Sequence, residues 1–284
     1  MSKPTHWRLI HSLPADGAWN MAVDEAMLLA GVAGLIPPTL RFYAWEPPTV
    51  SLGFFQPLDE RIDLAQIAAR GFGLVRRPSG GRAILHKDEL TYSVVAAEGL
   101  IPDGRSVMGS YRTLSRGIEA GLRLLGLGAE MPDRRHAPRM KAAGLPTVCF
   151  AASAGGDMVA GGRKIVGSAQ TRRGGVIMQH GSVPIHMDPA EHLAVMPGEG
   201  TDEASQQRLR QKACGVADAL GRPISFDDLA AALRQGFEEH FGITFEEAGL
   251  TEWETAQAKQ LRDERYATRA WTDHPAKRGA DGGT

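Results

Sequence analysis

The chain has 284 residues, 43% of them hydrophobic, and a formal net charge of −1. That length and hydrophobic share are enough for a large domain with a buried core. The balanced charge excludes a global basic field of the kind that neutralises nucleic-acid phosphates. The two cysteines, Cys149 and Cys214, lack the C-x-x-C spacing of disulfide frameworks and thiolate zinc sites, which fits a reducing cytoplasm.

Targeting and linker signals are missing from the sequence. Residues 1–10 are polar and no run of about 18 apolar residues occurs, so we expect neither a signal peptide nor a membrane span. We therefore expect a cytoplasmic protein with no nucleic-acid partner and no membrane partner. No linker rich in Pro, Gly or Ser divides the chain, which predicts a single catalytic domain over residues 1–270. A disordered tail is expected over residues 271–284.

The first half of the chain mixes helical and strand patterns. Apolar side chains recur at helical spacing over residues 20–30. The β-branched and aromatic segments 39–45 and 49–55 predict two strands around a turn at Pro47 and Pro48. Beyond them we expect a helix over 59–70, strands over 73–77 and 90–96, and a long helix over 108–125.

The second half opens with a basic, irregular segment, 133–146, which predicts a mobile loop. Two-glycine turns at Gly161-Gly162 and Gly174-Gly175 are typical of β-hairpins. The strands expected here are 148–150, 157–160, 164–171 and 175–186, followed by helices over 203–220, 226–240 and 250–266.

Two glycine-containing segments are the most informative part of the chain: RRPSGGRAILH from Arg76 to His86, and GGRKIVGSAQ from Gly161 to Gln170. Each sets glycines beside apolar and cationic side chains, which suits a backbone that approaches a ligand closely. Neither matches a phosphate-binding glycine loop, and no H-E-x-x-H motif or Ser-His-Asp order is visible in the chain. Acyl handling by an enzyme is therefore favoured over phosphate, metal or serine chemistry.

Cys149 lies between the two segments and has two interpretations. A free cysteine between Val148 and Phe150 is often only a small buried hydrophobe. If the hairpin folds Lys164 over it, the nearby ammonium lowers the thiol pKa from about 8.5 and activates the sulfur as a nucleophile. Lys164 alone is equally consistent with a solvated lysine. Cys214, between Ala213 and Gly215, is expected to be a buried helical residue.

Other polar residues near the segments are also ambiguous. His86 and His180 are more typical of core or hydrogen-bonding histidines than of metal ligands, so no metal site is expected. Six arginines fit either a solvated face or a positive rim that docks an acidic carrier protein. They are Arg76, Arg77, Arg82, Arg163, Arg172 and Arg173.

At these same residues the sequence resembles a known family. RRPSGGRAILH, with ELTYSV at 89–94, resembles the signature of the lipoate and biotin protein ligase superfamily. GRKIVGSAQTR, with IMQHGSV at 177–183, resembles its lipoyl branch. TVCF at 147–150 is similar to the cysteine-dependent octanoyltransferases of lipoate assembly. The likeness runs from about residue 7 to residue 271, and its motifs are long and specific.

The resemblance implies a mixed α/β (α+β) fold: a central, largely antiparallel sheet flanked by helices, with a smaller second sheet. It also implies transfer of an octanoyl group from octanoyl-acyl carrier protein to a lysine of the glycine-cleavage H protein. Cys149 would carry the acyl thioester and Lys164 would lower the thiol pKa. The residues carried over as substrate-binding are Arg77, Ser79, Gly80, Gly81, His86, Gly167, Gln170 and His180.

No cofactor is implied, because exchange of one thioester for another needs no nucleotide. ATP-using members of the superfamily usually carry His-Asp where this chain has His86-Lys87, which favours a transferase. The attacking lysine of the second step needs a base, for which Lys164 is the nearby candidate. The expected walls of the acyl slot are Ile84, Leu85, Val166 and Val176.

Three alternatives remain open at this stage. An ATP-dependent lipoate-protein ligase would not require Cys149. An amidotransferase would use the same cysteine but move octanoyl from H protein to dehydrogenase E2 subunits. In a non-catalytic module that binds acyl carrier protein, Cys149 would be only a core residue.

Overall fold

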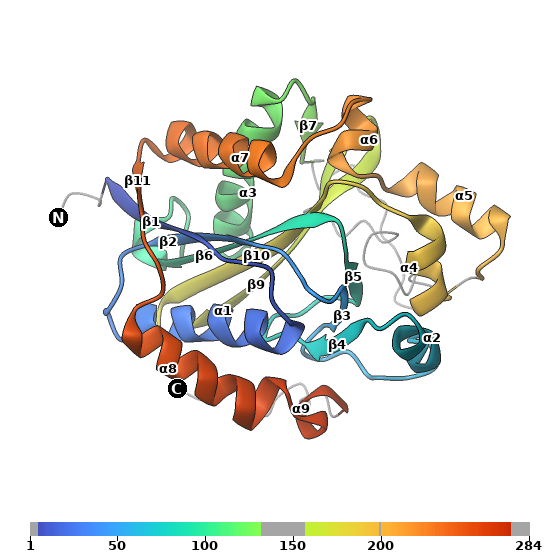
Figure 1. Cartoon of the computed structure of the whole chain (residues 1–284). Coiled ribbons are helices and arrows are strands. Elements are labelled where there is room, and N and C mark those ends of the chain that lie inside the picture. Colours follow the sequence, from blue (N-terminus) through green and yellow to red (C-terminus); the bar gives the residue numbers. More distant parts are fainter. Residues whose placement is uncertain (1–4, 132–156, 199, 274–284) are drawn as a thin grey trace.

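The computed structural model of the chain describes residues 5–131, 157–198 and 200–273, and Figure 1 shows their arrangement around one large and one small sheet. The strands are β1 (His6–His11), β2 (Thr39–Tyr43), β3 (Thr49–Leu52), β4 (Gly73–Arg76), β5 (Ile84–His86), β6 (Glu89–Ala97), β7 (Ala129–Glu130), β8 (Met158–Ala160), β9 (Arg163–Arg173), β10 (Val176–Pro184) and β11 (Thr244–Glu247).

The helices lie on the faces of both sheets. They are α1 (Gly17–Val32), α2 (Leu64–Ala69), α3 (Val107–Leu124), α4 (Pro189–Val195), α5 (Glu203–Lys212), α6 (Val216–Leu220), α7 (Phe226–Phe241), α8 (Glu252–Leu261) and α9 (Arg269–Asp273), with a 3₁₀ turn over Glu98–Leu100 and a π-helical turn over Arg262–Tyr266. In the described part of the chain, none of these helices has the length and apolar character needed to cross a membrane.

The large sheet has the order β11-β1-β2-β6-β10-β9-β8-β7. Only the pairs β11–β1 and β1–β2 are parallel, and every other pair in this sheet is antiparallel. The small sheet has the order β4-β3-β5. A largely antiparallel sheet with a smaller one beside it confirms the predicted fold class.

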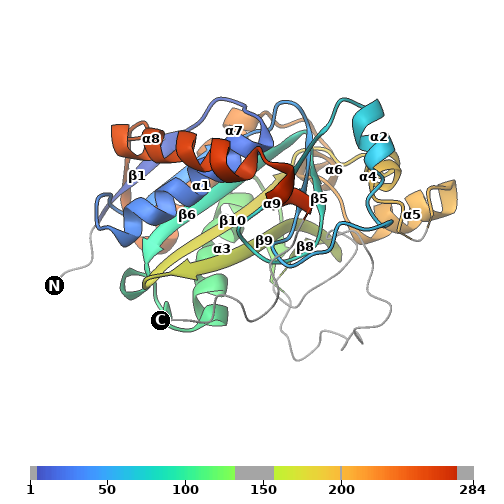
Figure 2. The same ribbon diagram turned by 90° about the horizontal axis from the view of Figure 1, so that it is seen from below.

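Helices cover both faces of the large sheet. In Figure 1, α3 and α7 lie on one face and α1 and α8 on the other, and Figure 2 shows α8 alongside α1. On α3, Leu114, Ile118 and Leu122 recur every four residues, so they form one apolar face against the sheet and Phe237 of α7. On the opposite face, Met27 of α1 belongs to a second apolar cluster. The sheet is therefore buried between two helical layers.

The small sheet has its own apolar core, formed with α2, α4 and α5. Val50 of β3, Ile67 of α2 and Leu193 of α4 contribute to it. The polypeptide passes from β4 to β5 through the first glycine segment. This placement sets that segment beside β9 and β10 of the large sheet, where a cavity forms.

Several sequence predictions of elements are confirmed, and others are wrong in instructive ways. The predicted helix 203–220 is two helices, because the chain is extended at Ala213 and Gly215 before α6 begins. Cys214 is buried as expected but lies between helices. Its N–H donates to the Lys164 carbonyl at 3.0 Å, which an intact helix would not allow.

The segments 39–45 and 49–55 predict two strands around one turn. The two strands form, but β2 belongs to the large sheet and β3 to the small one. Pro47 and Pro48 between them have no N–H to donate to a hairpin ladder. The predicted helix 59–70 begins only at Leu64, where Asp63 caps it. Near the end of the chain, α9 extends to Asp273, past the predicted boundary at 270. Segments 133–146 and 148–150 lie outside the described residues.

Candidate active site

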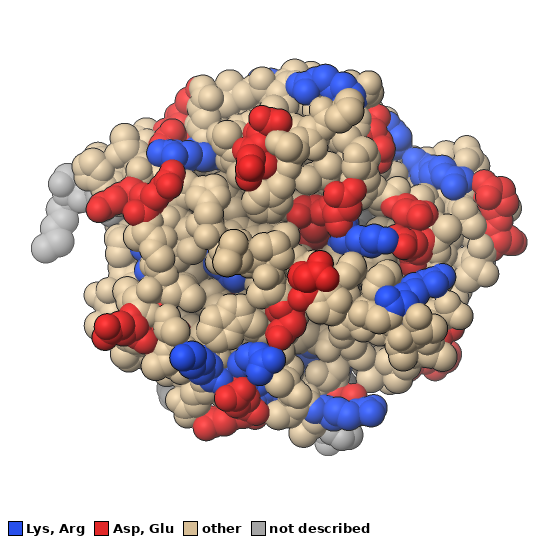
Figure 3. All heavy atoms as spheres, in the orientation of Figure 1, with Lys and Arg blue, Asp and Glu red and all other residues tan. Residues whose placement is uncertain are grey.

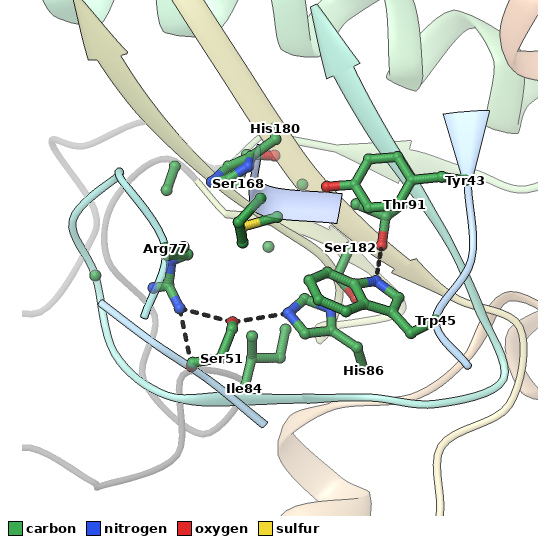
Figure 4. A pocket seen from close by; sticks show the side chains of 15 residues that line it. Tyr43, Trp45, Ser51, Arg77, Ile84, His86, Thr91, Ser168, His180 and Ser182 are labelled. Atoms are coloured by element: carbon green, nitrogen blue, oxygen red, sulfur yellow. Dashed lines mark hydrogen bonds between the residues drawn. The ribbon is translucent and has the colours of Figure 1, made fainter. Parts of the chain in front are cut away.

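A mostly apolar, partly open cavity lies between the two sheets, and Figure 4 shows the side chains around it. Strands β9 and β10 form one wall, and β2, β3, β5 and the first glycine segment form the others. The lining residues are Met21, Tyr43, Trp45, Ser51, Arg77, Gly81, Ile84, His86, Thr91, Gly167, Ser168, Ala169, His180, Gly181 and Ser182.

Strand register and a glycine contact shape this cavity. The antiparallel pairing of β9 with β10 sets Ala169 opposite His180 and Gly167 opposite Ser182. On the other wall, a Cβ added to Gly53 would lie 2.0 Å from the carbonyl oxygen of Gly81, which itself has φ +99. Only glycines allow this approach, so they press the first glycine segment against the end of β3.

His180 on β10 is held between a carboxylate and a hydroxyl. Its Nδ1 lies 2.9 Å from Asp24 Oδ2, and its Nε2 lies 2.5 Å from Ser79 Oγ. Since an ionised carboxylate only accepts hydrogen bonds, Nδ1 carries the proton and donates to Asp24. The arrangement joins α1, β10 and the first glycine segment at one point of the cavity.

Asp24 is fully buried but remains suited to carry charge. Arg41 pairs with it at 2.9 Å, and the Tyr43 hydroxyl donates to it at 2.9 Å. Burial alone would raise the pKa of Asp24, but the hydrogen bond from His180 and the charge of Arg41 outweigh it and lower this pKa below its usual value. Burial and the neighbouring Asp24 raise the pKa of Tyr43 well above its usual value, so its hydroxyl remains a donor.

His86 on β5 is held in the same way on another wall. Its Nδ1 lies 2.7 Å from Glu89, its Nε2 lies 2.8 Å from the Ser51 hydroxyl, and its ring stacks on Trp45 at 4.0 Å. Glu89 also accepts from the hydroxyls of Thr91 and Ser182. These bonds and His86 outweigh the effect of burial, which alone would raise the pKa of Glu89, and lower this pKa.

Arg77 connects the end of β3 to the first glycine segment by hydrogen bonds. Its guanidinium donates to the hydroxyl and carbonyl of Ser51 (Figure 4). It also donates to the carbonyls of Gly80 and Arg82. Its side chain therefore fixes the curve of the first glycine segment around the cavity. Ser51 accepts from Arg77, which leaves its own hydrogen free to donate to His86.

The structure brings most of the predicted substrate-binding residues together. Five of the eight line the cavity: Arg77, Gly81, His86, Gly167 and His180. Ser79 contacts His180, and the Gly80 carbonyl accepts from Arg77. Gln170 lies outside the lining, in a polar cluster where it bonds Ser110, Arg172 and Gln179.

Of the four predicted slot walls, only Ile84 lines the cavity. Leu85 points into the core of the small sheet, and Val166 and Val176 pack in the two cores of the large sheet. Strand alternation explains the errors at Leu85 and Val166, because they neighbour the lining residues Ile84 and Gly167 and so face the opposite side. Val176 instead lies at the far end of β10, four residues from His180. The same alternation could have identified Tyr43, the last residue of β2, and Trp45, two residues beyond it, which both face the cavity.

Lys164 on β9 is buried and forms an ion pair with Asp157, whose Oδ1 lies 2.8 Å from Lys164 Nζ. This burial excludes the alternative that Lys164 is only a solvated lysine. Cys149 lies outside the described residues. Burial raises the pKa of the Cys214 thiol, which makes Cys214 a poor nucleophile.

The predicted rim of six arginines does not form. Arg76 is fully buried, where its guanidinium satisfies the carbonyls of Gly53, Gln56 and Thr272, and Arg77 is buried beside the cavity. Arg172 and Arg173 lie at the β9–β10 turn, eight to nine residues or about 26–30 Å along β9 from Lys164.

The face of the molecule drawn in Figure 3 carries charged side chains of both signs. On the face drawn in Figure 3, lysine and arginine are interspersed with aspartate and glutamate and form no single-sign field. Within residues 5–131, 157–198 and 200–273, no group of three or more His, Cys, Asp or Glu side chains is placed to hold a metal ion.

Comparison with known proteins agrees with this geometry. Residues 16–238 match the lipoyl protein ligase A/B catalytic domain. The chain belongs to this family. The predicted family resemblance is thereby confirmed.

Curated relatives of this family member are octanoyltransferases. It is 43% identical over 270 residues to octanoyltransferase LipM of Symbiobacterium thermophilum, covering 94% of this chain and 98% of the relative. It is 42% identical over 259 residues to octanoyltransferase LipM of Kyrpidia tusciae, covering 90% and 94%. These relatives confirm the prediction of an acyltransferase of lipoate assembly.

Solved structures agree in fold. A lipoate-protein ligase A bound with ATP superposes with a TM-score of 0.77 at 28% identity, covering 94% of this chain and 98% of that one. A bipartite lipoate protein ligase of an archaeal lipoylation system, studied with its E2 lipoyl domain from Thermoplasma acidophilum, gives 0.77 at 27% identity, with 97% and 99% covered. Fold alone therefore does not separate transferases from ligases.

Proposed function

We propose that this family member takes an octanoyl group from octanoyl-acyl carrier protein, carries it as a thioester on Cys149 and passes it to a lysine of the glycine-cleavage H protein. The observation that carries the proposal is that β9, the strand that holds Lys164, also lines the apolar cavity. Gly167, the first β9 residue of the lining, is about 10 Å along the strand from Lys164. An acyl carbonyl near Lys164 would therefore place its hydrocarbon chain toward the cavity.

In the first step, the Cys149 thiolate attacks the carrier thioester. A carbon–sulfur bond forms to Cys149, the bond to the carrier sulfur breaks, and the carrier leaves as a thiol after it takes a proton. The buried ammonium of Lys164 would favour the thiolate form of Cys149. The cavity, lined by Met21, Trp45 and Ile84, removes the octanoyl chain from water.

In the second step, the lysine amine of the acceptor attacks the thioester and an amide forms. An amide is more stable than a thioester, so this step drives the cycle without a nucleotide. Lys87, which stands where ligases usually carry aspartate, is paired with Glu191 at the surface. Position 87 therefore holds a lysine directly after His86, where ligases usually carry a carboxylate, and this difference supports a transferase.

An intact-mass experiment tests the covalent intermediate. Purified protein is mixed with octanoyl-acyl carrier protein without ATP, and we expect one octanoyl adduct on the enzyme. Cys149→Ala should lose both adduct and transfer, while the matched Cys214→Ala variant should keep both. An adduct or full transfer in Cys149→Ala would contradict the proposal.

A competition between acceptors tests the second half of the proposal. The octanoyl enzyme is offered H protein and dehydrogenase E2 lipoyl domains separately, and we expect faster transfer to H protein. Preferential transfer to E2 domains from octanoyl H protein would instead identify an amidotransferase. Transfer from free octanoate that depends on ATP would identify a ligase.

A further inference from the structure

Asp157 has no part in either step of the proposed reaction, yet its carboxylate lies against the ammonium of Lys164. The side chains of Asp157 and Lys164 are only 6% and 4% exposed, and their charged atoms are 2.8 Å apart. A buried carboxylate is costly unless it is paired. The pairing with Lys164 is therefore a built feature of this region and not a surface ion pair.

The backbone around the pair is fixed from two sides. Strands β8 and β9 form a hairpin through Gly161 and Gly162, whose φ values of +56 and +76 suit a tight two-residue turn. A register shift between Met158 and Val159 re-aims the start of β8, directly after Asp157. On its other side, the Lys164 carbonyl accepts the Cys214 N–H at 3.0 Å.

The pair decides what Lys164 can do in the reaction. A buried ammonium without a counter-charge tends to lose its proton, whereas a carboxylate in contact favours the charged form. An ammonium ion cannot accept a proton, so a lysine held in this form is no general base. A fixed positive charge, in contrast, stabilises a thiolate or a developing oxyanion without changing its own protonation.

We propose that Asp157 is a positioning residue that holds the Lys164 ammonium charged and in place, so that Lys164 acts as a permanent cation and not as the base of amide formation. The inference rests on the proposed function for the identity of the neighbouring sulfur. It replaces the sequence-based expectation that Lys164 accepts a proton from the incoming amine.

Other titratable groups near Lys164 do not replace Asp157. Cys214, from the segment between α5 and α6, has a thiol pKa raised by burial and stays neutral. Glu130 of β7 is in register with Val159, the strand partner of Lys164, but it is exposed and therefore screened by water. Arg163 adds positive charge next to Lys164 and does not offset it. Among the described residues, Asp157 is the buried carboxylate in contact with Lys164.

The protons of the second step then balance without Lys164. The acceptor ammonium gives one proton to water and becomes an amine. The amine nitrogen forms a bond to the acyl carbon, the bond from that carbon to the Cys149 sulfur breaks, and the second proton moves from nitrogen to sulfur. Lys164 keeps its proton throughout.

Lysine-detected NMR tests the charge directly. The full chain is labelled with ¹³C at lysine Cε, and the Lys164 signal is assigned by its absence from Lys164→Arg. We expect the signal of the wild type to keep the charged-lysine shift over the whole pH range of activity. In Asp157→Asn it should titrate at least about one pH unit lower, because the counter-charge is gone. Asp157→Glu, which keeps a carboxylate, should behave like the wild type.

Octanoyl transfer kinetics test the role. If Lys164 is a fixed cation, Lys164→Arg should lose less than about 100-fold in transfer while Lys164→Met loses more, since general-base catalysis alone is worth about 10²–10⁴. In Asp157→Asn the pH optimum of transfer should move to lower pH, and Asp157→Glu should restore the wild-type profile. A merely structural loss would lower the rate without moving the profile.

The outcomes separate this inference from the proposed function. A neutral-lysine shift in the active pH range, an Asp157→Asn signal that titrates like the wild type, or equal losses in Lys164→Arg and Lys164→Met would overturn it. If the wild type forms no octanoyl adduct on Cys149, the proposed function fails, while the NMR measurement still decides whether Asp157 holds Lys164 charged.

Discussion

Two buried histidines face the cavity from different walls, and each has a carboxylate on Nδ1 and a serine hydroxyl on Nε2. His180 joins Asp24 to Ser79, and His86 joins Glu89 to Ser51. The histidines come from motifs far apart in the sequence, yet their hydrogen-bonding pattern is the same.

These two hydrogen-bonded arrays, Asp24–His180–Ser79 and Glu89–His86–Ser51, differ in how the negative charge of the carboxylate is balanced. Asp24 contacts the buried guanidinium of Arg41 as well as His180. Around Glu89, the structure shows hydrogen bonds from His86 and the hydroxyls of Thr91 and Ser182, and no lysine or arginine pairs with it within the described residues. Asp24 therefore anchors α1 to the large sheet through charge, whereas Glu89 depends on dipoles and on one histidine.

The largest effect should come from breaking the charge-compensated array. Arg41→Met leaves Asp24 as a buried carboxylate without its arginine, and we expect the free energy of unfolding to fall by about 3–5 kcal/mol. Urea unfolding at pH 7 measures this loss. Arg210→Met, which removes an exposed ion pair with Glu203, is the matched control and should change stability by less than about 1 kcal/mol. Similar losses in both variants would contradict the difference between buried and exposed pairs.

Only part of this site could be read from the sequence. The apolar spacing of the long helices predicted α3 and α7, and the family-like motifs RRPSGGRAILH and IMQHGSV contain His86 and His180, because these signals are local. Asp24 sits on a helix where an acidic residue normally faces water, and only the fold buries it. Its partner Arg41 is a cation inside a strand pattern, so nothing local indicates the pair.

Arg76 shows the same limit in the opposite direction. Beside Arg77 and Arg82 it looked like a surface cation, but it satisfies carbonyls of Gly53 and Thr272, which come from distant parts of the chain. Such long-range contacts are set by the assembled sheets and not by neighbours in sequence. Asp157 was likewise invisible as the partner of Lys164 until the β8–β9 register was known.

A smaller effect is expected in the array without an arginine. Glu89→Gln keeps the shape of the side chain but replaces an acceptor oxygen with an NH₂ group that faces the donors of His86, Thr91 or Ser182. We expect a loss of about 1–3 kcal/mol in urea unfolding, less than for Arg41→Met. A loss as large as that of Arg41→Met would mean that Glu89 carries as much of the fold as the Asp24 array.

Acid should reduce the cost of Glu89→Gln. The pKa of Glu89 is lowered in the folded protein, so its contribution is present above the unfolded value of about 4.5 and is lost as pH falls through the lower folded value. The stability difference between wild type and Glu89→Gln should therefore be constant from pH 7 to about 5 and shrink at lower pH. Urea unfolding of both proteins over this pH series measures it. Parallel curves down to the lowest pH would show that Glu89 has no such linkage.

The smallest change concerns the ring that supports the second array. Trp45 stacks on His86, and its Nε1–H donates to the Thr91 hydroxyl at 2.7 Å. Trp45→Phe keeps an aromatic ring against His86 but removes this donor, so we expect a loss of about 1 kcal/mol in stability. Thr91 would keep its bond to Glu89, so His86 should stay in place and kcat should change little. A somewhat higher KM for a small octanoyl thioester is expected, because the smaller ring covers less of the acyl chain. If kcat fell strongly while KM stayed constant, Trp45 would be needed to orient His86 during the reaction, and the second array would be more than a wall of the cavity.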